Sequence, residues 1–200
     1  MHVATRIINN NRTVKDQEQL MNSTTSETTS TASGGVQVEI VRLPPMRVAA
    51  FHGFGAEPEH AAVTKLLAWA QGHGLLDGAR TRRVFGFNNP SPSAASPHYG
   101  YEFWLELSEA EAAALAADSG KAAGGASGGD VEFKSYAGGV YAVTRCRGVA
   151  AIPDAWRALV TWCEDSPYAF GSDQCLEQHL GDLAGPVEEL DFALYQSVQE

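Results

Sequence analysis

Apolar and polar residues alternate along several short segments of this chain, as they do in half-buried β-strands. The first is VQVEIVRL at 36–43, whose valines and isoleucine at alternate positions share one face. Pro44 and Pro45 interrupt this pattern, and RVAAFHGFG at 47–55 resumes it as a second strand ending in glycines. These segments predict two extended stretches separated by a sharp break.

A helical period follows the second strand. Pro58 suits a first helical turn, Gly72 and Gly74 suit the end, and the apolar residues between them recur at helical spacing, at Val63, Leu66, Leu67 and Ala70. Two further strands are predicted at 82–89 and 98–107, RRVFGFNN and HYGYEFWLEL. A short alanine-rich helix should come next, because Ser108 and Glu111 have the spacing of a capping box.

Two low-complexity segments delimit this pattern. Residues 21–35 are almost entirely Ser, Thr and Gly, so we interpret residues 1–35 as a disordered leader. The glycine-rich residues 120–130 are interpreted as a flexible linker. The remainder, 36–200, is predicted to be one domain with halves at 36–119 and 131–200.

The two halves repeat one pattern. A shift of 93 positions places the apolar stripe of the first helix on Trp156, Leu159, Val160 and Cys163. A shift of 89 places Glu102 on Asp191 and Phe103 on Phe192. Each half then reads strand, helix, strand, strand, so we predict an α+β fold of tandem pseudo-symmetric βαββ repeats that form one antiparallel sheet with the helices on one face.

Strand alternation places an acidic residue beside an aromatic one on the face away from the helices. Leu176 and Leu180 are expected under the helices, together with Tyr101 and the other odd-numbered residues of 99–107. The opposite face then collects acidic and aromatic side chains, at Glu102, Trp104, Glu177, His179, Asp191 and Tyr195. Such a surface suits a flat organic cation through charge attraction and cation–π contact. A solvated outer sheet face is the alternative.

Composition excludes several classes of function. The net charge of −10 belongs to residues 36–200, because charges balance within the leader, and an acidic domain of this kind disfavours direct nucleic-acid binding. Signal-peptide and membrane-spanning patterns are absent from the sequence, and the three cysteines fit no disulfide or metal spacing, so a cytoplasmic location is expected. The six histidines have no metal-ligand spacing, and no phosphate loop occurs, so neither metal nor cofactor is predicted.

Several motifs together are similar to those of a known family. They include LPPMRVAAFHG at 43–53, YGYEFWLEL at 99–107, IPDAWRALVTW at 152–162 and CLEQHL at 175–180. From about Val36 onward the chain resembles the GyrI-like small-molecule-binding domain, also called the AraC-type effector-binding domain. This resemblance implies a groove between the two βαββ halves that takes lipophilic, often cationic, molecules.

The resemblance also implies site residues. The family's central acidic residue falls on Glu102 and its second glutamate on Glu177, and aromatic walls map to Trp104, Tyr141, Tyr168 and Tyr195. The tyrosine usual in the family after the CLE motif is His179 here. Because residues 1–35 do not resemble a helix-turn-helix domain, the chain is interpreted as a stand-alone member.

Three functions remain open at this point. The leading one is a non-enzymatic binder of a hydrophobic cationic small molecule, for sensing or sequestration in transcription regulation or multidrug resistance. The second is a hydrolase of strained-ring genotoxins, with Glu102 as general acid or base. The third is an acidic protein inhibitor of a DNA-associated enzyme such as gyrase. A protein partner and a homodimer both stay open, and no membrane partner is expected.

Overall fold

The computed structural model describes residues 26–31, 35–76, 82–121, 131–186 and 188–199. The strands are β1 (Ser26–Thr31), β2 (Gln37–Leu43), β3 (Met46–Gly55), β4 (Val84–Asn88), β5 (Tyr99–Leu107), β6 (Glu132–Tyr136), β7 (Gly139–Arg147), β8 (Ala169–Phe170), β9 (Leu176–Leu180) and β10 (Asp191–Gln199). The helices are α2 (Pro58–Gly72), α3 (Glu109–Lys121) and α4 (Ile152–Asp165), with a 3₁₀ turn, η2 (Val149–Ala151), before α4.

All strands belong to one antiparallel sheet, in the order β1-β2-β7-β10-β9-β4-β5-β3-β6, with β8 beside β10. The strands of the two halves correspond as β2 to β6, β3 to β7, β4 to β9 and β5 to β10. Exchanging them reverses the order from β2 to β6 and leaves every strand pairing the same, so β4 and β9 form a central seam. The predicted repeat of strand, helix, strand, strand is therefore confirmed, and so is the α+β class.

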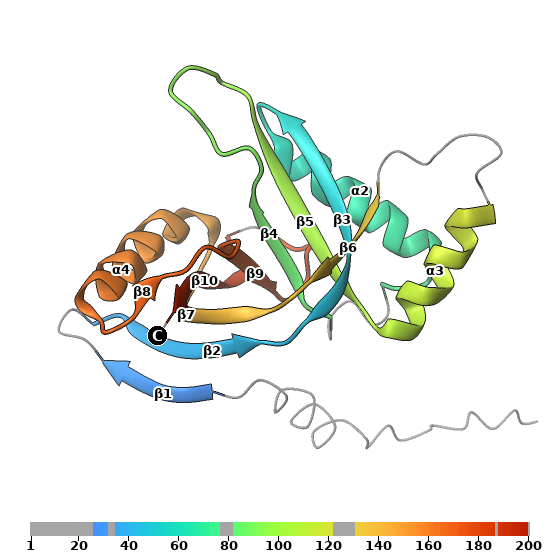
Figure 1. The fold of residues 1–200 in the computed structure, drawn as a ribbon. Helices are drawn as coiled ribbons and strands as arrows, with labels where there is room; N and C mark the ends of the chain where they lie inside the picture. Colours follow the sequence, from blue (N-terminus) through green and yellow to red (C-terminus); the bar gives the residue numbers. More distant parts are fainter. Residues whose placement is uncertain (1–25, 32–34, 77–81, 122–130, 187, 200) are drawn as a thin grey trace, which may run out of the picture.

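The first strand of each half is bent and shared between the halves. β2 pairs with β7 of the second half, whereas its continuation β3 pairs with β5 of the first half. In the same way β6 pairs with β3, and its continuation is β7. The prolines at positions 44 and 45 make the first of these bends. In Figure 1, β2 runs along the lower side of the second half, and the chain then curves upward into β3 beside β5.

Helices α2 and α4 pack on the same face of the sheet, one over each half. Leu66 and Ala70 of α2 are buried against β3 and β5, as the apolar stripe predicted. Leu159 and Cys163 take the equivalent places in α4, against β7 and β10. Full burial of each leucine contributes about 1.5 to 3 kcal/mol, so these stripes fix both helices over the sheet.

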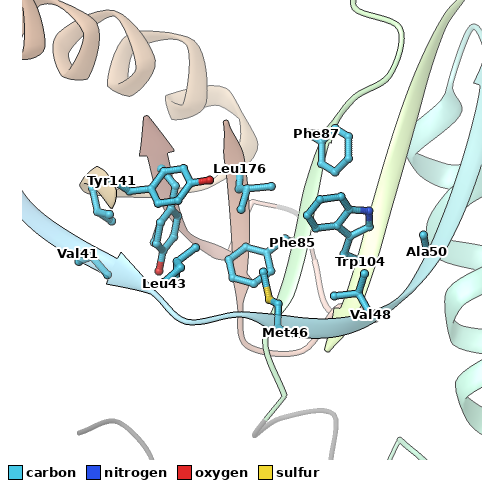
Figure 2. Close-up of a cluster of buried hydrophobic side chains, with 13 residues drawn as sticks. Val41, Leu43, Met46, Val48, Ala50, Phe85, Phe87, Trp104, Tyr141 and Leu176 are labelled. Atoms are coloured by element: carbon cyan, nitrogen blue, oxygen red, sulfur yellow. The ribbon is translucent and has the colours of Figure 1, made fainter. Parts of the chain in front are cut away.

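The opposite face of the sheet is closed by its own curvature. Because β2 and β3 run across both halves, side chains from strands at both ends of the sheet meet in one buried cluster (Figure 2). Phe85, Tyr141 and Leu176 have no exposed surface there. The alternative of a solvated outer face is wrong, and so is the expectation of an open acidic and aromatic surface.

The ends of some predicted segments differ from expectation. Residues 26–31, expected within the disordered leader, form β1 and pair with β2, whereas residues 1–25 and 32–34 lie outside the described residues. Helix α3 begins after the predicted capping box, which is confirmed by hydrogen bonds between Ser108 and Glu111 in both directions. It continues to Lys121, two residues into the expected linker, and residues 122–130 are not described.

Candidate functional site

Glu102 is buried but does not face the helices. Only 3% of the residue is exposed, and Lys134 Nζ lies 2.6 Å from its Oε1. Trp104 Nε1 donates to the same oxygen at 2.6 Å, and Asn89 donates to Oε2 at 2.8 Å. Burial alone would raise the pKa of Glu102, but these donors hold it below its ordinary value. The carboxylate is thus buried and ion-paired.

Three of the four aromatic residues predicted to form the walls of the ligand site are buried in the core. Trp104, Tyr141 and Tyr195 belong to the buried cluster of Figure 2, on the face away from the helices. The Tyr195 hydroxyl donates to Gln178 at 2.6 Å and that of Tyr141 donates to the Gln174 carbonyl at 3.0 Å, so both are internally satisfied. Tyr168 stacks on Trp162 beside α4.

Strand β9 has the opposite orientation to the one expected. Leu176 packs into the buried cluster, whereas Glu177 and His179 face the helices. The pairing explains this, because Glu177 lies opposite Leu194, a residue of the cluster under α4, and paired residues share a face. The expectation that Glu177 lies beside Glu102 is wrong.

The Glu177 carboxylate is held by one donor from each half of the molecule. Tyr101 of β5 donates to Oε2 at 2.8 Å, and the Trp156 indole of α4 donates to Oε1 at 2.9 Å. Burial, then the proximity of Glu177, raises the pKa of Tyr101 well above 10, so its hydroxyl keeps its proton at neutral pH. Two donors leave lone pairs of the carboxylate free, since it can accept about four hydrogen bonds.

Gly86 makes the Tyr101 contact geometrically accessible. It lies directly opposite Glu177 on the neighbouring strand β4, and a Cβ at this position would be 2.3 Å from the Tyr101 hydroxyl oxygen. The tyrosine ring therefore crosses the strand where no side chain stands in its way.

A cavity of about 680 Å³ opens above this carboxylate, over the β4–β9 seam and between α2 and α4. We call it the groove. Most of its wall is apolar or aromatic, from Val63, Tyr101, Phe103, Ile152, Leu190 and Phe192. Glu57, Glu59 and Glu177 contribute carboxylates, and no lysine or arginine is among the described residues that line it.

His179 lies beside Glu177 in the groove. Its ring is held between Phe103 and Phe192, with ring centroids 4.9 and 5.0 Å away. Burial lowers the pKa of His179 to about 4, so the imidazole is neutral at pH 7.

Comparison with protein-family models gives a match over residues 36–196, to the GyrI-like small molecule binding domain. The chain belongs to this family. No curated protein matches the GyrI-like chain significantly. Its fold is also found in the EcmrR C-terminal domain, with a TM-score of 0.57 and 13% identity over 83% of this chain and 99% of that one.

Two further solved structures share the GyrI-like fold. A hydrolase from Listeria innocua aligns with a TM-score of 0.57 and 12% identity, over 81% of this chain and 91% of its own. EcmrR in complex with DNA aligns with a TM-score of 0.56 and 13% identity, over 82% of this chain and 57% of its own. At such identities the likeness establishes the fold alone, and the family assignment establishes a small-molecule-binding domain.

Of the six ligand-binding residues predicted for this GyrI-like domain, Glu177 alone lines the groove; the others are Glu102, Trp104, Tyr141, Tyr168 and Tyr195. The prediction missed Tyr101 and Phe103, which it had assigned to the core under the helices, and it also missed Phe192. The signal that identifies them is the pairing of β9 with β4 and β10, which places Glu177 among helix-facing residues.

Metal chemistry has no basis in the described residues. No group of three or more His, Cys, Asp and Glu side chains among them is arranged to hold an ion. The cysteines at 146, 163 and 175 are free thiols. No helix in the described part of the chain is long and apolar enough to span a membrane.

Gly86→Ala should displace Tyr101 from Glu177. The added methyl group overlaps the tyrosine hydroxyl, and overpacking of this kind costs roughly 1 to 2 kcal/mol of folding free energy. The check is urea unfolding of Gly86→Ala in the wild-type and Tyr101→Ala backgrounds. Because Ala lacks the hydroxyl and also the ring carbons Cε1 and Cζ, which would lie 2.6 and 2.7 Å from the added methyl group, the second background should show a smaller loss. Equal losses in both would contradict the proposed packing.

Proposed function

We propose that this GyrI-like domain binds a lipophilic cation in the groove, with Glu177 as the acidic centre. The observation that carries the proposal is a half-buried carboxylate on the floor of an apolar cavity that has no lysine or arginine among its described lining residues. The biological role that fits this binding is sensing or sequestration of such molecules, in transcription regulation or drug resistance.

The chemistry of the groove favours positive charge combined with a flat apolar body. Phe103, Phe192 and Tyr101 offer ring surface, and a cation over such a ring gains about 0.5 to 2 kcal/mol, more as water is excluded. Free lone pairs on Glu177 attract the same charge. Stacking tolerates variation in ligand shape, so affinity should extend over a class of compounds.

The position of the groove also suits a sensor. A ligand there contacts α2 and β5 of the first half and α4, β9 and β10 of the second half. Binding therefore stabilises one arrangement of the halves relative to others, and a ligand shifts a conformational equilibrium through such differential contacts. This coupling across the seam supports sensing over simple storage.

The test compares two dyes of nearly equal shape at pH 7.5, the permanent cation 10-methylacridinium and neutral acridine. Wild-type protein should bind the cation more tightly. Glu177→Gln should weaken binding of the cation about tenfold, which corresponds to about 1.4 kcal/mol, and leave acridine binding unchanged. Fluorescence titration measures each dissociation constant.

Glu102→Gln is the matched control, since it makes the same chemical change on the other face of the sheet. It should leave both affinities unchanged. Equal binding of the two dyes, or equal effects of the two substitutions, would contradict the proposal. Mass spectrometry of the recovered dyes should show no product, and a product that depends on Glu177 would make the domain an enzyme instead.

A further inference from the structure

His179 has two polar atoms that the protein leaves without partners. Both ring nitrogens, Nδ1 and Nε2, are buried and make no hydrogen bond with any residue that the structure describes. Among the described residues the only other buried side-chain atom of this kind is Nε of Arg82, whose terminal nitrogens are paired with Glu111. Of these two side chains, His179 is the one in which no polar atom has a hydrogen-bond partner.

Unpartnered buried polar atoms are rare in folded proteins, and each calls for an explanation. The phenyl rings of Phe103 and Phe192 hold the imidazole in place but offer it no hydrogen-bond donor or acceptor. The backbone of β9 gives the position no alternative, since its neighbours Val84 and Phe192 in the sheet are apolar. His179 lines the groove, so a ligand bound there is the remaining candidate for a polar partner of the ring.

The neutral state of His179 decides what it recognises. A neutral imidazole has one N–H donor and one nitrogen acceptor, and it does not repel a cation. Its pKa of about 4 keeps it in this state throughout the physiological range. Both nitrogens are covered in this structure, so a ligand reaches them once the side chains around the ring shift. A ligand N–H group then donates to the free nitrogen of His179, an interaction that a fully alkylated cation cannot make.

Glu177 and His179 are two residues apart on one face of β9. This spacing separates their backbones by roughly 7 Å along the strand. A fused-ring cation is long enough to contact both side chains at once, with its ring against Phe103 or Phe192.

We propose that His179 is a specificity-determining residue of the groove, which selects cations that carry an N–H group over quaternary cations that carry none. The inference rests on the proposed function, because it names the class of cation that the Glu177 groove prefers. Its structural basis is that neither ring nitrogen of His179 has a hydrogen-bond partner among the described residues.

The experiment adds a third dye, protonated 9-aminoacridine, to 10-methylacridinium and acridine at pH 7.5. Both cations share one ring system, but only 9-aminoacridine has N–H donors. Wild-type protein should bind it at least tenfold more tightly than 10-methylacridinium. His179→Phe keeps an aromatic ring between the two phenylalanines and removes both nitrogens, so it should reduce this ratio to about one.

The outcomes separate the two proposals. If His179→Phe leaves the ratio unchanged while Glu177→Gln still weakens both cations, His179 is not a selectivity residue and the proposed function stands. If neither cation binds wild-type protein more tightly than acridine does, the proposed function fails and this inference fails with it. His179→Asn restores a hydrogen-bonding side chain and should recover part of the ratio, whereas a purely structural role of the ring predicts no recovery.

Discussion

Lys134→Met is expected to lower the free energy of unfolding by about 3 kcal/mol at pH 7. Lys134 is the cation that neutralises Glu102, and only 4% of the Glu102 side chain is exposed. Removing one partner of a buried ion pair typically costs 3 to 5 kcal/mol, because the other charge stays buried without compensation. The lower end applies here, since Lys134 is partly exposed and Trp104 and Asn89 still donate to the carboxylate. Urea unfolding measures the loss.

A double-mutant cycle makes this prediction specific. Lys134→Met combined with Glu102→Gln removes both charges, so the double variant should be more stable than Lys134→Met alone by at least about 1 kcal/mol. Arg157→Met is the control, because the Arg157–Asp154 pair is largely exposed and such pairs contribute about 0 to 1 kcal/mol. Additive effects of the two substitutions would show that Glu102 and Lys134 are not coupled.

Acidification from pH 6.5 to pH 4 is expected to destabilise the protein through His179 by up to about 3 kcal/mol. The pKa of His179 is about 4 in the folded protein, against an ordinary value of 6.5. In this window the unfolded chain binds a proton that the folded protein does not, so stability falls as pH falls. The contribution is fully present above pH 6.5 and is lost on passing below pH 4. The difference of about 2.5 pKa units, at 1.36 kcal/mol each, sets the limit.

His179→Phe should remove this part of the pH dependence. The measurement is the free energy of unfolding in urea at pH 7, 6, 5 and 4.5, for wild type and variant. Carboxylates titrate in both proteins, so the difference between the two profiles isolates the histidine. Parallel profiles for wild type and His179→Phe would contradict a buried neutral imidazole.

Most of the fold was predictable because its signals are local. The stripe at Leu66 and Ala70, the break at the two prolines and the Ser108 cap each act within a few residues of the chain, and each is confirmed. The repeat was visible for the same reason, since it is a recurrence of local patterns. What the repeat could not reveal is that β2 and β6 pair with strands of the opposite half, which depends on contacts between distant segments.

The site was harder to predict because alternation shows which residues share a face but not which face they occupy. On β9 the leucines at 176 and 180 suggested the helix side, yet the curled sheet offers an equally apolar environment on its other side. Leu176 occupies that second core, and Glu177 is thereby turned towards the groove. The same curvature converted the expected Glu102 site into an internal ion pair.

The exchange of strands between halves bears on how such a fold arises. The strand order is the same after the halves are swapped. Each half therefore contacts the other through the same surface, as the subunits of a two-fold homodimer do. One ancestral βαββ peptide could build the entire architecture by self-association. The facing positions of the seam are nevertheless free to differ between the halves, and Gly86 and Glu177, one bare and one charged, make this part of a symmetric scaffold asymmetric.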